Sequence, residues 1–309
     1  MSDKYVKPIV ITPGFYQLGT PAYPAYLSVG EYAMLIEGGI GATSALIVKQ
    51  LQELSVTPEK IKYIALTHTH PDHIGGVIFW KKLWPQVKVI ANTTCAKMLK
   101  SEELPKEFTK LDGIISEILL IKGEINEWPA VIENPVFDVD MVLGEGDKID
   151  LGRGISWSVL DTPGHSPCHT SYYNRSQGIV IIGDATGLYD PTRDIFWPNY
   201  FDSLELYCDS IRKLYSLHGE YGALSHNGVI KGDVRNHFRK AMQATEAFHN
   251  GMFKRVANGE DPKKVTLETA KWVYTFTNMQ PFEVIFGLTR LMFRRSQAAT
   301  GKPDLFKLP

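Results

Sequence analysis

Short apolar runs that end in a turn containing glycine or proline recur along this chain. The clearest are Tyr63–Leu66, Trp157–Leu160, Ile179–Ile182 and Ala223–Leu224. Each has the length and apolar character of a buried β-strand. A histidine or an aspartate follows each run within a few residues. Because loops at strand ends are where binding and catalytic groups gather, this pattern predicts one site assembled at the ends of several strands.

The rest of the pattern alternates strands with amphipathic helices and ends in helices only. It predicts β-hairpins over 9–37, a strand over 87–91, alternating strands and helices over 142–228, and helices over 42–54, 72–84, 233–256, 264–274 and 281–297. We therefore expect a mixed α/β (α+β) chain. Its body would span residues 1–232, and a helical C-terminal region would span residues 233–309.

Residues 68–73 read His-Thr-His-Pro-Asp-His, directly after the first of these runs. Imidazole nitrogens and a carboxylate oxygen are good ligands for zinc, iron or manganese. In an extended segment, residues two apart point to the same side, so His68 and His70 can bind one ion together. The plainer alternative is a solvated histidine-rich loop. The later strand ends carry further histidines and an aspartate, which favours the metal site.

Four motifs, taken in chain order, resemble those of the metallo-β-lactamase-fold superfamily. They are Thr67–Gly76 (T-H-x-H-x-D-H-x-G-G), Thr162–His165 (T-P-G-H), Gly183–Asp184 and His226. The resemblance covers about residues 10–230 and implies a four-layer αββα sandwich, with a helical insert and a C-terminal helical cap as additions. Within the superfamily the chain is similar to the glyoxalase II-like thioesterase branch. The segments Ile36–Gly39, Gly164–Ser166 with His169, and Gly183–Ala185 are similar to those of quinolone-signal response thioesterases.

The resemblance also implies a dinuclear metal site, with zinc as the first expectation and iron or manganese as alternatives. By position, His68, His70 and His165 would hold one ion, Asp72, His73 and His226 the other, and Asp184 would bridge the two. A hydroxide bridging the ions would be the nucleophile, because metal binding lowers the pKa of water from ~15.7 to about 7. Asp72 and Asp184 are thus the candidate catalytic residues. His169 either hydrogen-bonds to a ligand carboxylate or pairs with backbone in a strand.

Two segments lie outside the shared motifs: an insert over about 97–138 and the C-terminal helices. In the insert, apolar residues recur at helical spacing: Leu111, Ile114, Ile115, Ile118, Leu119 and Ile121. The insert either packs on the body or, as we expect, forms a lid over a hydrophobic pocket. The helix over 281–297 is apolar almost all round, which predicts that it is buried or forms a homodimer contact. A cluster of basic residues lies beside it in the sequence: Arg290, Arg294, Arg295 and Lys302. The cluster either pairs with the phosphates of coenzyme A or, as is more common for such clusters, forms a solvated face.

Composition narrows the function further. Of 309 residues, 44% are hydrophobic and 22% charged, enough for a sizeable core. The net charge of −1 gives no general attraction to nucleic acid or to acidic membranes. The absence of a long apolar run and of an apolar leader predicts a soluble, cytoplasmic protein without a membrane partner. Cys95, Cys168 and Cys208 are odd in number and widely spaced, so no disulfide framework is expected, and Cys168 is expected to be an apolar filler.

These observations predict a metal-dependent hydrolase of thioesters, of the acyl-CoA or acyl-glutathione type, with the C-terminal helices capping the site. A lactonase or other ester hydrolase of the same fold stays open, as does a regulatory binding protein that retains the metals. A nuclease is disfavoured because the chain has no basic surface run. Tyr189, Trp197 and Tyr200 follow Asp184 on a loop and are the candidate substrate contacts, with loop packing as the alternative for each.

Overall fold

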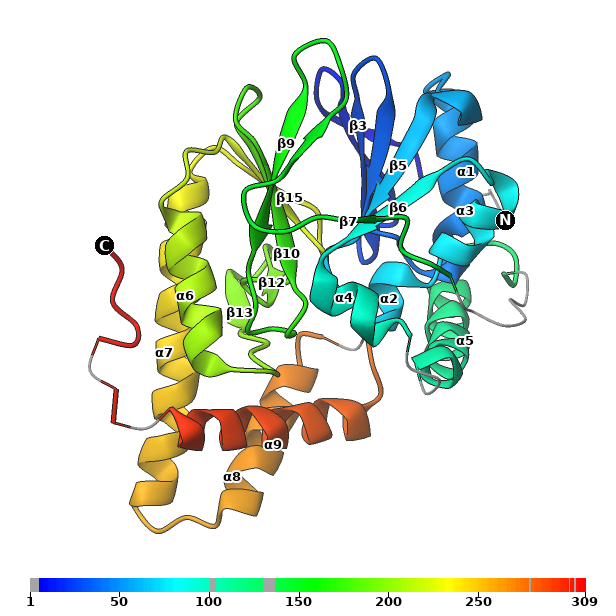
Figure 1. The fold of residues 1–309 in the computed structure, drawn as a ribbon. Coiled ribbons are helices and arrows are strands. Elements are labelled where there is room, and N and C mark those ends of the chain that lie inside the picture. Colours follow the sequence, from blue (N-terminus) through cyan, green and yellow to red (C-terminus); the bar gives the residue numbers. More distant parts are fainter. Residues whose placement is uncertain (1–5, 101–103, 130–136, 278, 300, 303) are drawn as a thin grey trace.

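Two β-sheets form the centre of the molecule (Figure 1). The computed structural model describes residues 6–100, 104–129, 137–277, 279–299, 301–302 and 304–309, and within 104–111 only the side chain of residue 110. The first sheet contains, in spatial order, β1 (Ile9–Thr12), β2 (Phe15–Gly19), β3 (Pro24–Val29), β4 (Ala33–Ile36), β5 (Ile61–Ala65), β6 (Lys88–Ala91) and β7 (Met141–Val142). Strands β1 to β4 pair antiparallel, and β4 to β7 pair in parallel.

The second sheet contains, in spatial order, β15 (Val229–Lys231), β14 (Tyr221–Leu224), β11 (Ile179–Gly183), β10 (Thr170–Asn174), β9 (Ser156–Asp161) and β8 (Lys148–Asp150). Strands β11 and β14 pair in parallel, and the other neighbours pair antiparallel. A separate hairpin, β12 (Leu188–Asp190) with β13 (Ile195–Trp197), follows β11. The parallel pair requires a crossover between its strands, and the crossover includes this hairpin and a helix.

Helices cover both outer faces of the sheet pair (Figure 1). They are α1 (Ser44–Glu53), α2 (Pro71–Ile74), α3 (Val77–Leu83), α4 (Thr93–Met98), α5 (Leu104–Lys122), α6 (Leu204–Tyr215), α7 (Val234–Ala257), α8 (Pro262–Tyr274) and α9 (Phe282–Ala298), with short 3₁₀ turns η1 (Gly41–Thr43) and η2 (Pro58–Lys60). The predicted helix over 72–84 is divided into α2 and α3. The three predicted C-terminal helices are confirmed as α7, α8 and α9.

The apolar runs of the sequence are strands that are buried on both faces. In β4, Met34 packs between the two sheets, whereas Leu35 packs outward against the α1 and α3 layer. In β11, Ile181 packs between the sheets and Ile182 packs outward with residues of α6 and α7. Successive side chains of a strand point to opposite faces, so a strand buried on both faces shows no polar alternation. The resulting layers confirm the predicted αββα fold.

The insert packs beside the sheets. On α5, Ile115 and Leu119 are buried in a cluster with Ile40, and the Asp112 carboxylate accepts a hydrogen bond of 2.9 Å from the Gly41 backbone N–H. Ile121 faces solvent with 79% of its surface exposed, and the side chain of Leu111 lies outside the described residues. None of the insert residues in the described ranges lines the cavity described below. This part of the insert therefore packs on the body instead of forming the expected lid.

Helix α9 crosses beneath the strands at the lower side of the molecule (Figure 1). Ile285, Met292 and Phe293 are buried in one cluster with residues of α6 and α7. Val284, on another side of the helix, keeps 40% of its surface exposed. The helix is thus amphipathic and only partly buried, which corrects the first alternative of the prediction. The alternative of a homodimer contact stays a prediction. Its partly exposed apolar residues face a cavity, as shown below.

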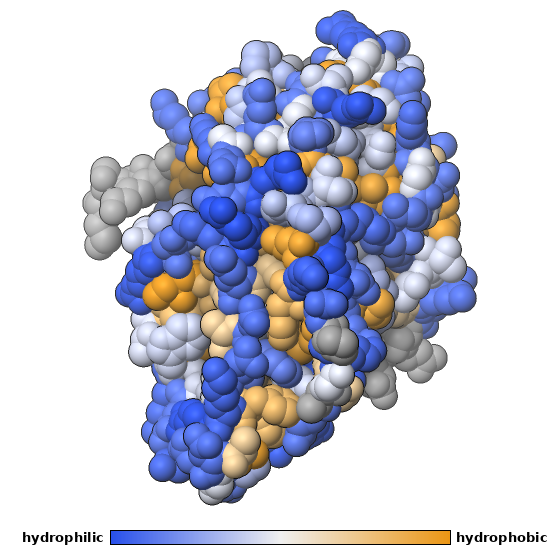
Figure 2. Space-filling view, turned by 90° about the vertical axis from the view of Figure 1, so that its left-hand side faces the viewer, coloured by the Kyte–Doolittle hydropathy of each residue, from blue (hydrophilic) through white to orange (hydrophobic). Residues whose placement is uncertain are grey.

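No helix within the described ranges has both the length and the apolar character needed to cross a bilayer. Figure 2 shows the face on the α6 and α7 side, where apolar residues gather among hydrophilic ones in the middle and lower part. Leu206 on α6 and Trp272 on α8 are among the exposed large apolar residues of the chain, at 42% and 44% exposure. Scattered exposure of this kind is ordinary for folded proteins.

Candidate metal centre

All seven predicted metal ligands meet at one end of the two sheets. Thr67 to His70 follow β5, the loop with His165 follows β9, Asp184 follows β11, and His226 follows β14. The side chains form overlapping groups whose candidate ligand atoms lie within 4.8 Å of one another: His68, His70 and His165; His68, His73 and Asp184; and Asp72, His73 and His226. The two sheets therefore each contribute part of one cluster, as the motif pattern predicts.

Asp184 lies at the centre of this cluster. Its Oδ2 atom is 3.3 Å from His73 Nε2 and 3.5 Å from His165 Nε2. The Nε2 atoms of His68 and His226 lie slightly further from it, at 3.8 and 3.9 Å. One carboxylate oxygen thus faces histidines of both predicted ligand sets, which is the position that a bridging ligand requires.

Four of the histidines are held so that Nε2 faces the cluster. His165 Nδ1 donates to the Asn199 carbonyl at 2.9 Å, and His226 Nδ1 donates to the Ala22 carbonyl at 2.8 Å. His73 Nδ1 lies 3.1 Å from Glu37 Oε2, and His68 Nδ1 lies 3.0 Å from the Thr67 hydroxyl. Nδ1 carries a proton in these contacts, so Nε2 is the ring atom that faces the cluster. Burial would lower the pKa of His73, but the Asp72 and Glu37 carboxylates hold it well above its usual range, so a bound metal would displace a proton from His73 Nε2.

His70 is oriented differently. Its Nδ1 lies 2.8 Å from His68 Nε2 and 3.0 Å from His165 Nε2, so His70 faces the shared position through Nδ1. Burial is the main cause that lowers the pKa of His70 to about 3 and that of His165 to about 4. Both rings are therefore neutral at pH 7, and three lone pairs converge without a proton donor of their own.

The carboxylates complete the donor set. Burial alone would raise the pKa of Asp184, but the neighbouring histidines, first His226 and His165, hold it well below its usual range. The pKa of Asp72 is lowered against burial in the same way, by His73 and His226. Asp184 Oδ1 is buried and has no hydrogen-bond partner among the described residues. Imidazole nitrogens, ionised carboxylates and an unpaired buried oxygen fit divalent cations in this cluster.

Glu37 is a functional residue that the sequence analysis missed. It follows β4 next to the β5 end, and its side chain is buried at 1% exposure. Its carboxylate accepts hydrogen bonds from the Ser225 hydroxyl at 2.6 Å and from the Thr67 hydroxyl at 3.0 Å, in addition to the His73 contact. A lone acid after a strand has no distinctive spacing. The available signal was its strand position: β4 neighbours β5, which leads into the histidine motif.

Two glycines allow the ligand loops to pass close to other groups. Gly183 has a φ of +62°, and a Cβ there would lie 2.6 Å from His169 Nε2. Gly164 has a φ of +123°, and a Cβ there would lie 2.2 Å from the Tyr207 backbone nitrogen. A larger residue at either position would meet both steric contact and an unfavourable backbone conformation. These positions therefore determine where Asp184 and His165, the next residues, are held.

His169 binds backbone rather than a ligand carboxylate. Its Nε2 accepts a hydrogen bond of 3.0 Å from the Asp184 backbone N–H, and its Nδ1 lies 2.8 Å from the Thr162 hydroxyl. Burial lowers the pKa of His169 to about 3, so the ring is neutral and can accept at Nε2. His169 thereby fixes the backbone of the central aspartate. Neighbouring Cys168 is buried, but its Sγ lies 3.2 Å from the Ser166 hydroxyl and 3.5 Å from the Thr69 hydroxyl, so the expected apolar filler is corrected to a thiol with polar partners.

A cavity of about 300 Å³ opens beside the cluster. Trp197 is among its lining residues. Tyr189 and Tyr200, the other candidate substrate contacts, are not. Tyr200 is fully buried with its hydroxyl 2.9 Å from Ser296 Oγ, and the Tyr189 hydroxyl donates to Asp194 at 2.8 Å on the other side of the hairpin. Neither residue lines the cavity, so of the three predicted substrate contacts Trp197 alone remains a candidate.

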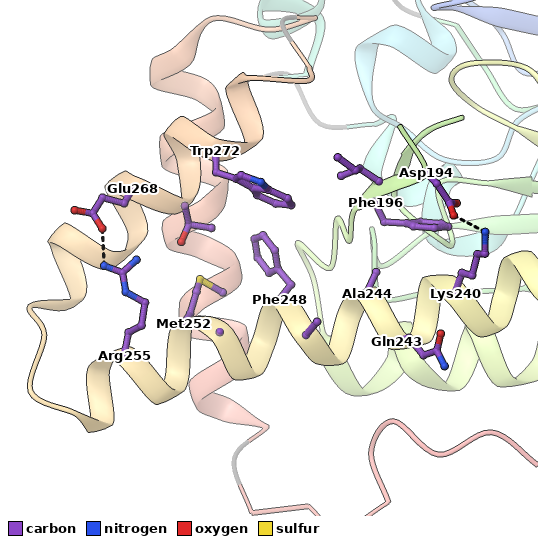
Figure 3. A pocket seen from close by; sticks show the side chains of 14 residues that line it. Asp194, Phe196, Lys240, Gln243, Ala244, Phe248, Met252, Arg255, Glu268 and Trp272 are labelled. Carbon is purple, nitrogen blue, oxygen red and sulfur yellow. Dashed lines mark hydrogen bonds and ion pairs between the residues drawn. The ribbon is translucent and has the colours of Figure 1, made fainter. Parts of the chain in front are cut away.

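A larger cavity of about 750 Å³ lies between α7, α8 and the strand β13 (Figure 3). Phe196, Phe248 and Trp272 contribute to its apolar wall. Its charged groups are paired: Lys240 binds Asp194 and Arg255 binds Glu268. It shares no lining residue with the cavity beside the ligand cluster. Position next to the donor set, rather than volume, therefore identifies the candidate active site.

The model of the Metallo-beta-lactamase superfamily matches residues 23–226, which include all seven predicted ligands. The chain belongs to this superfamily. It is 28% identical over 141 residues to a hydroxyacylglutathione hydrolase of Legionella pneumophila (strain Lens), a match that covers 46% of this chain and 39% of the relative. It is 26% identical over 234 residues to the atrochrysone carboxyl ACP thioesterase of Aspergillus fumigatus, covering 75% of this chain and 58% of the relative.

A solved structure is similar over nearly the whole chain. A metallo-beta-lactamase family protein from Thermus thermophilus matches with a TM-score of 0.64 at 22% identity, covering 95% of this chain and 97% of the other. At this identity the likeness establishes the fold. The two named hydrolases are matched over less than two thirds of their own lengths. Their activities therefore support a proposal about the function of this superfamily member but do not establish it.

Proposed function

We propose that the protein is a metal-dependent hydrolase of thioesters. The observation that supports this most directly is a metal-ligand cluster that opens onto a cavity with a mainly apolar wall. Such a cavity suits an acyl group whose carbonyl lies at the donor set. The two hydrolases named above, which act on a glutathione conjugate and on an ACP-linked substrate by their names, support the same class. Similarity to quinolone-signal response thioesterases stays a prediction.

The cluster has donors for two cations, with His68, His70 and His165 on one side, Asp72, His73 and His226 on the other, and Asp184 between them. Zinc, iron and manganese all accept this donor set, with zinc our first expectation. When bound, such ions lower the pKa of water and polarise a carbonyl oxygen.

Asp72 and Asp184 are the carboxylates among the described residues that line the cavity. They are therefore the groups placed to orient an attacking water. The water oxygen adds to the thioester carbonyl carbon, the C–S bond breaks, and the proton passes to the thiolate. The products are a carboxylic acid and a free thiol.

Charge distribution along the chain supports a negatively charged thiol carrier. Residues 233–309 contain 13 Lys and Arg against 7 Asp and Glu, whereas residues 1–232 contain 20 against 27. The C-terminal region, which supplies α9 to the cavity, is thus basic, and the body is acidic. Coenzyme A, glutathione and acidic carrier proteins all bear negative charge, so a basic cap favours their approach. The exact carrier is open among these.

The test is thiol release from a panel of acyl-CoA and acyl-glutathione thioesters by purified protein of known metal content. We expect turnover that disappears on chelation and returns when the metal is restored. A protein that holds its metal but releases no thiol from any thioester would contradict the proposal. Turnover of neutral lactones in that case would favour the ester-hydrolase alternative, since the same cavity admits them.

A further inference from the structure

Beyond the ligand cluster, the wall of the active-site cavity is mainly apolar, with Tyr23, Asn199, Thr277 and Gln280 as its polar members. Its apolar residues come from two sources. The body contributes Leu188, Trp197 and Phe201, and α9 with the segment before it contributes Met279, Val284, Ile285, Leu288 and Leu291. Val284, Leu288 and Leu291 are spaced by four and three residues and therefore lie on one side of α9. Helix α9 thus presents an apolar stripe to the space next to the donor set.

Helix α9 is held in this position by contacts near its C-terminal end. Tyr200 and Ser296 join their hydroxyls at 2.9 Å, and Arg295 Nε donates to the Phe201 carbonyl at 3.0 Å. Asn199 precedes Tyr200 and Phe201 in the chain, and its backbone carbonyl accepts the hydrogen bond of the predicted ligand His165. One short loop therefore links α9 to the metal cluster, so that the apolar stripe has a defined place relative to the reacting carbonyl.

The cavity, in its described residues, offers no cationic lysine or arginine side chain to a negatively charged acyl group. Among the described residues that line it there is no lysine and no arginine. Arg295 follows the stripe one turn further along α9, but its Nε is bound to the Phe201 carbonyl and it does not line the cavity. A carboxylate on the acyl chain would therefore lose its hydration without gaining a cation, a large cost in an apolar site.

We propose that the substrate's acyl group is uncharged and apolar, and that Val284, Leu288 and Leu291 of α9 determine this specificity. The inference rests on the proposed hydrolysis of thioesters and specifies the class of acyl group. The negative charge of the substrate resides on the carrier, outside the cavity. A volume of about 300 Å³ is at the lower end for small-molecule sites (~300–1,000 Å³), which suits a short or medium acyl group.

The test compares hexanoyl and adipoyl thioesters, which differ only by a terminal methyl in place of a carboxylate, on both coenzyme A and glutathione. We expect kcat/KM for hexanoyl to exceed that for adipoyl about 100-fold, because the unpaired carboxylate is excluded. In Leu288→Lys, the new ammonium faces that carboxylate, and the ratio should fall at least about 10-fold. The control Gln297→Lys adds the same charge to the exposed side of α9 and should keep the wild-type ratio. Metal content is measured for each variant.

A hexanoyl preference below about 3-fold, or a ratio that Leu288→Lys leaves unchanged, overturns the inference. The same pair as p-nitrophenyl esters separates it from the proposed function. If the protein prefers the hexanoyl ester to the adipoyl ester but hydrolyses no thioester, the inference about the acyl group stands and the proposed thioesterase function is rejected. Binding of the thioethers S-hexyl and S-(5-carboxypentyl), on both carriers, gives a readout without turnover. Calorimetry should show the S-hexyl form binding at least about 10-fold more tightly, and equal binding or no binding overturns the inference.

Discussion

Replacing Glu37 with glutamine should weaken metal binding although Glu37 touches no metal position itself. Glutamine has nearly the same size and shape, so the buried site can hold it without a cavity. What changes is the number of acceptors. The carboxylate accepts from Ser225, Thr67 and His73, at 2.6, 3.0 and 3.1 Å. An amide offers one acceptor oxygen and a nitrogen that only donates.

The expected loss follows from the two orientations of the amide. If its nitrogen faces His73, the ring must move its proton to Nε2, which removes the lone pair that a metal needs. If its oxygen faces His73, the hydroxyls of Ser225 and Thr67 must rotate to accept, and the negative charge behind the ring is lost. Changes behind a metal-bound histidine typically cost 10–100-fold in metal affinity, or about 1.4 to 2.7 kcal/mol.

The measurement is competition for Zn²⁺ between the protein and a chromophoric chelator at pH 7, with Mn²⁺ as a second ion. Glu220→Gln is the matched control, because Glu220 is exposed and lies away from the cluster. Thermal melting of both variants in chelator shows whether the metal-free fold persists. An unchanged metal affinity in a folded Glu37→Gln protein would refute the role assigned to Glu37.

Three further perturbations have defined outcomes. Asp184→Ala should abolish bound metal and thiol release together, and full activity measured alongside elemental analysis would contradict the central position of that carboxylate. His237, whose Nε2 contacts the Thr186 hydroxyl, has a pKa lowered to about 4 from 6.5, mainly by burial, so its contribution to stability is lost as pH falls from 6.5 toward 4. Between pH 7 and 4, the free energy of unfolding should therefore fall by up to about 3 kcal/mol less in His237→Gln than in the wild type. Denaturant titrations in which this free energy changes with pH equally in both proteins would count against this. Gly164→Ala should destabilise the fold by more than about 2 kcal/mol and lower metal content, whereas Gly144→Ala, with open space around it, should melt like the wild type in calorimetry.

The fold could be predicted in most of its elements because the apolar pattern is local. Strands buried on both faces appear as unbroken runs such as Ile179–Ile182, and the amphipathic period placed the three C-terminal helices to within a few residues. What the pattern left undecided was the contact each helix makes. Helix α5 has an apolar side that would suit a lid or a packed helix equally well, and only its neighbours, such as Ile40, show that it packs on the body.

The sequence by itself determined which side chains can bind metal, because histidine and aspartate at strand ends with close spacing form a pattern that chance rarely produces. Only the tertiary structure decided which groups hold those ligands and what the ligands face. Glu37 and the carbonyls of Asn199 and Ala22 orient the imidazoles, and backbone carbonyls carry no sequence pattern. The apolar stripe of α9 lines the cavity because the chain returns to the end of the sheets where the ligands lie. In the sequence, the stripe lies more than a hundred positions after the first ligands. Local periodicity cannot encode such a contact, since it depends on how whole elements pack together.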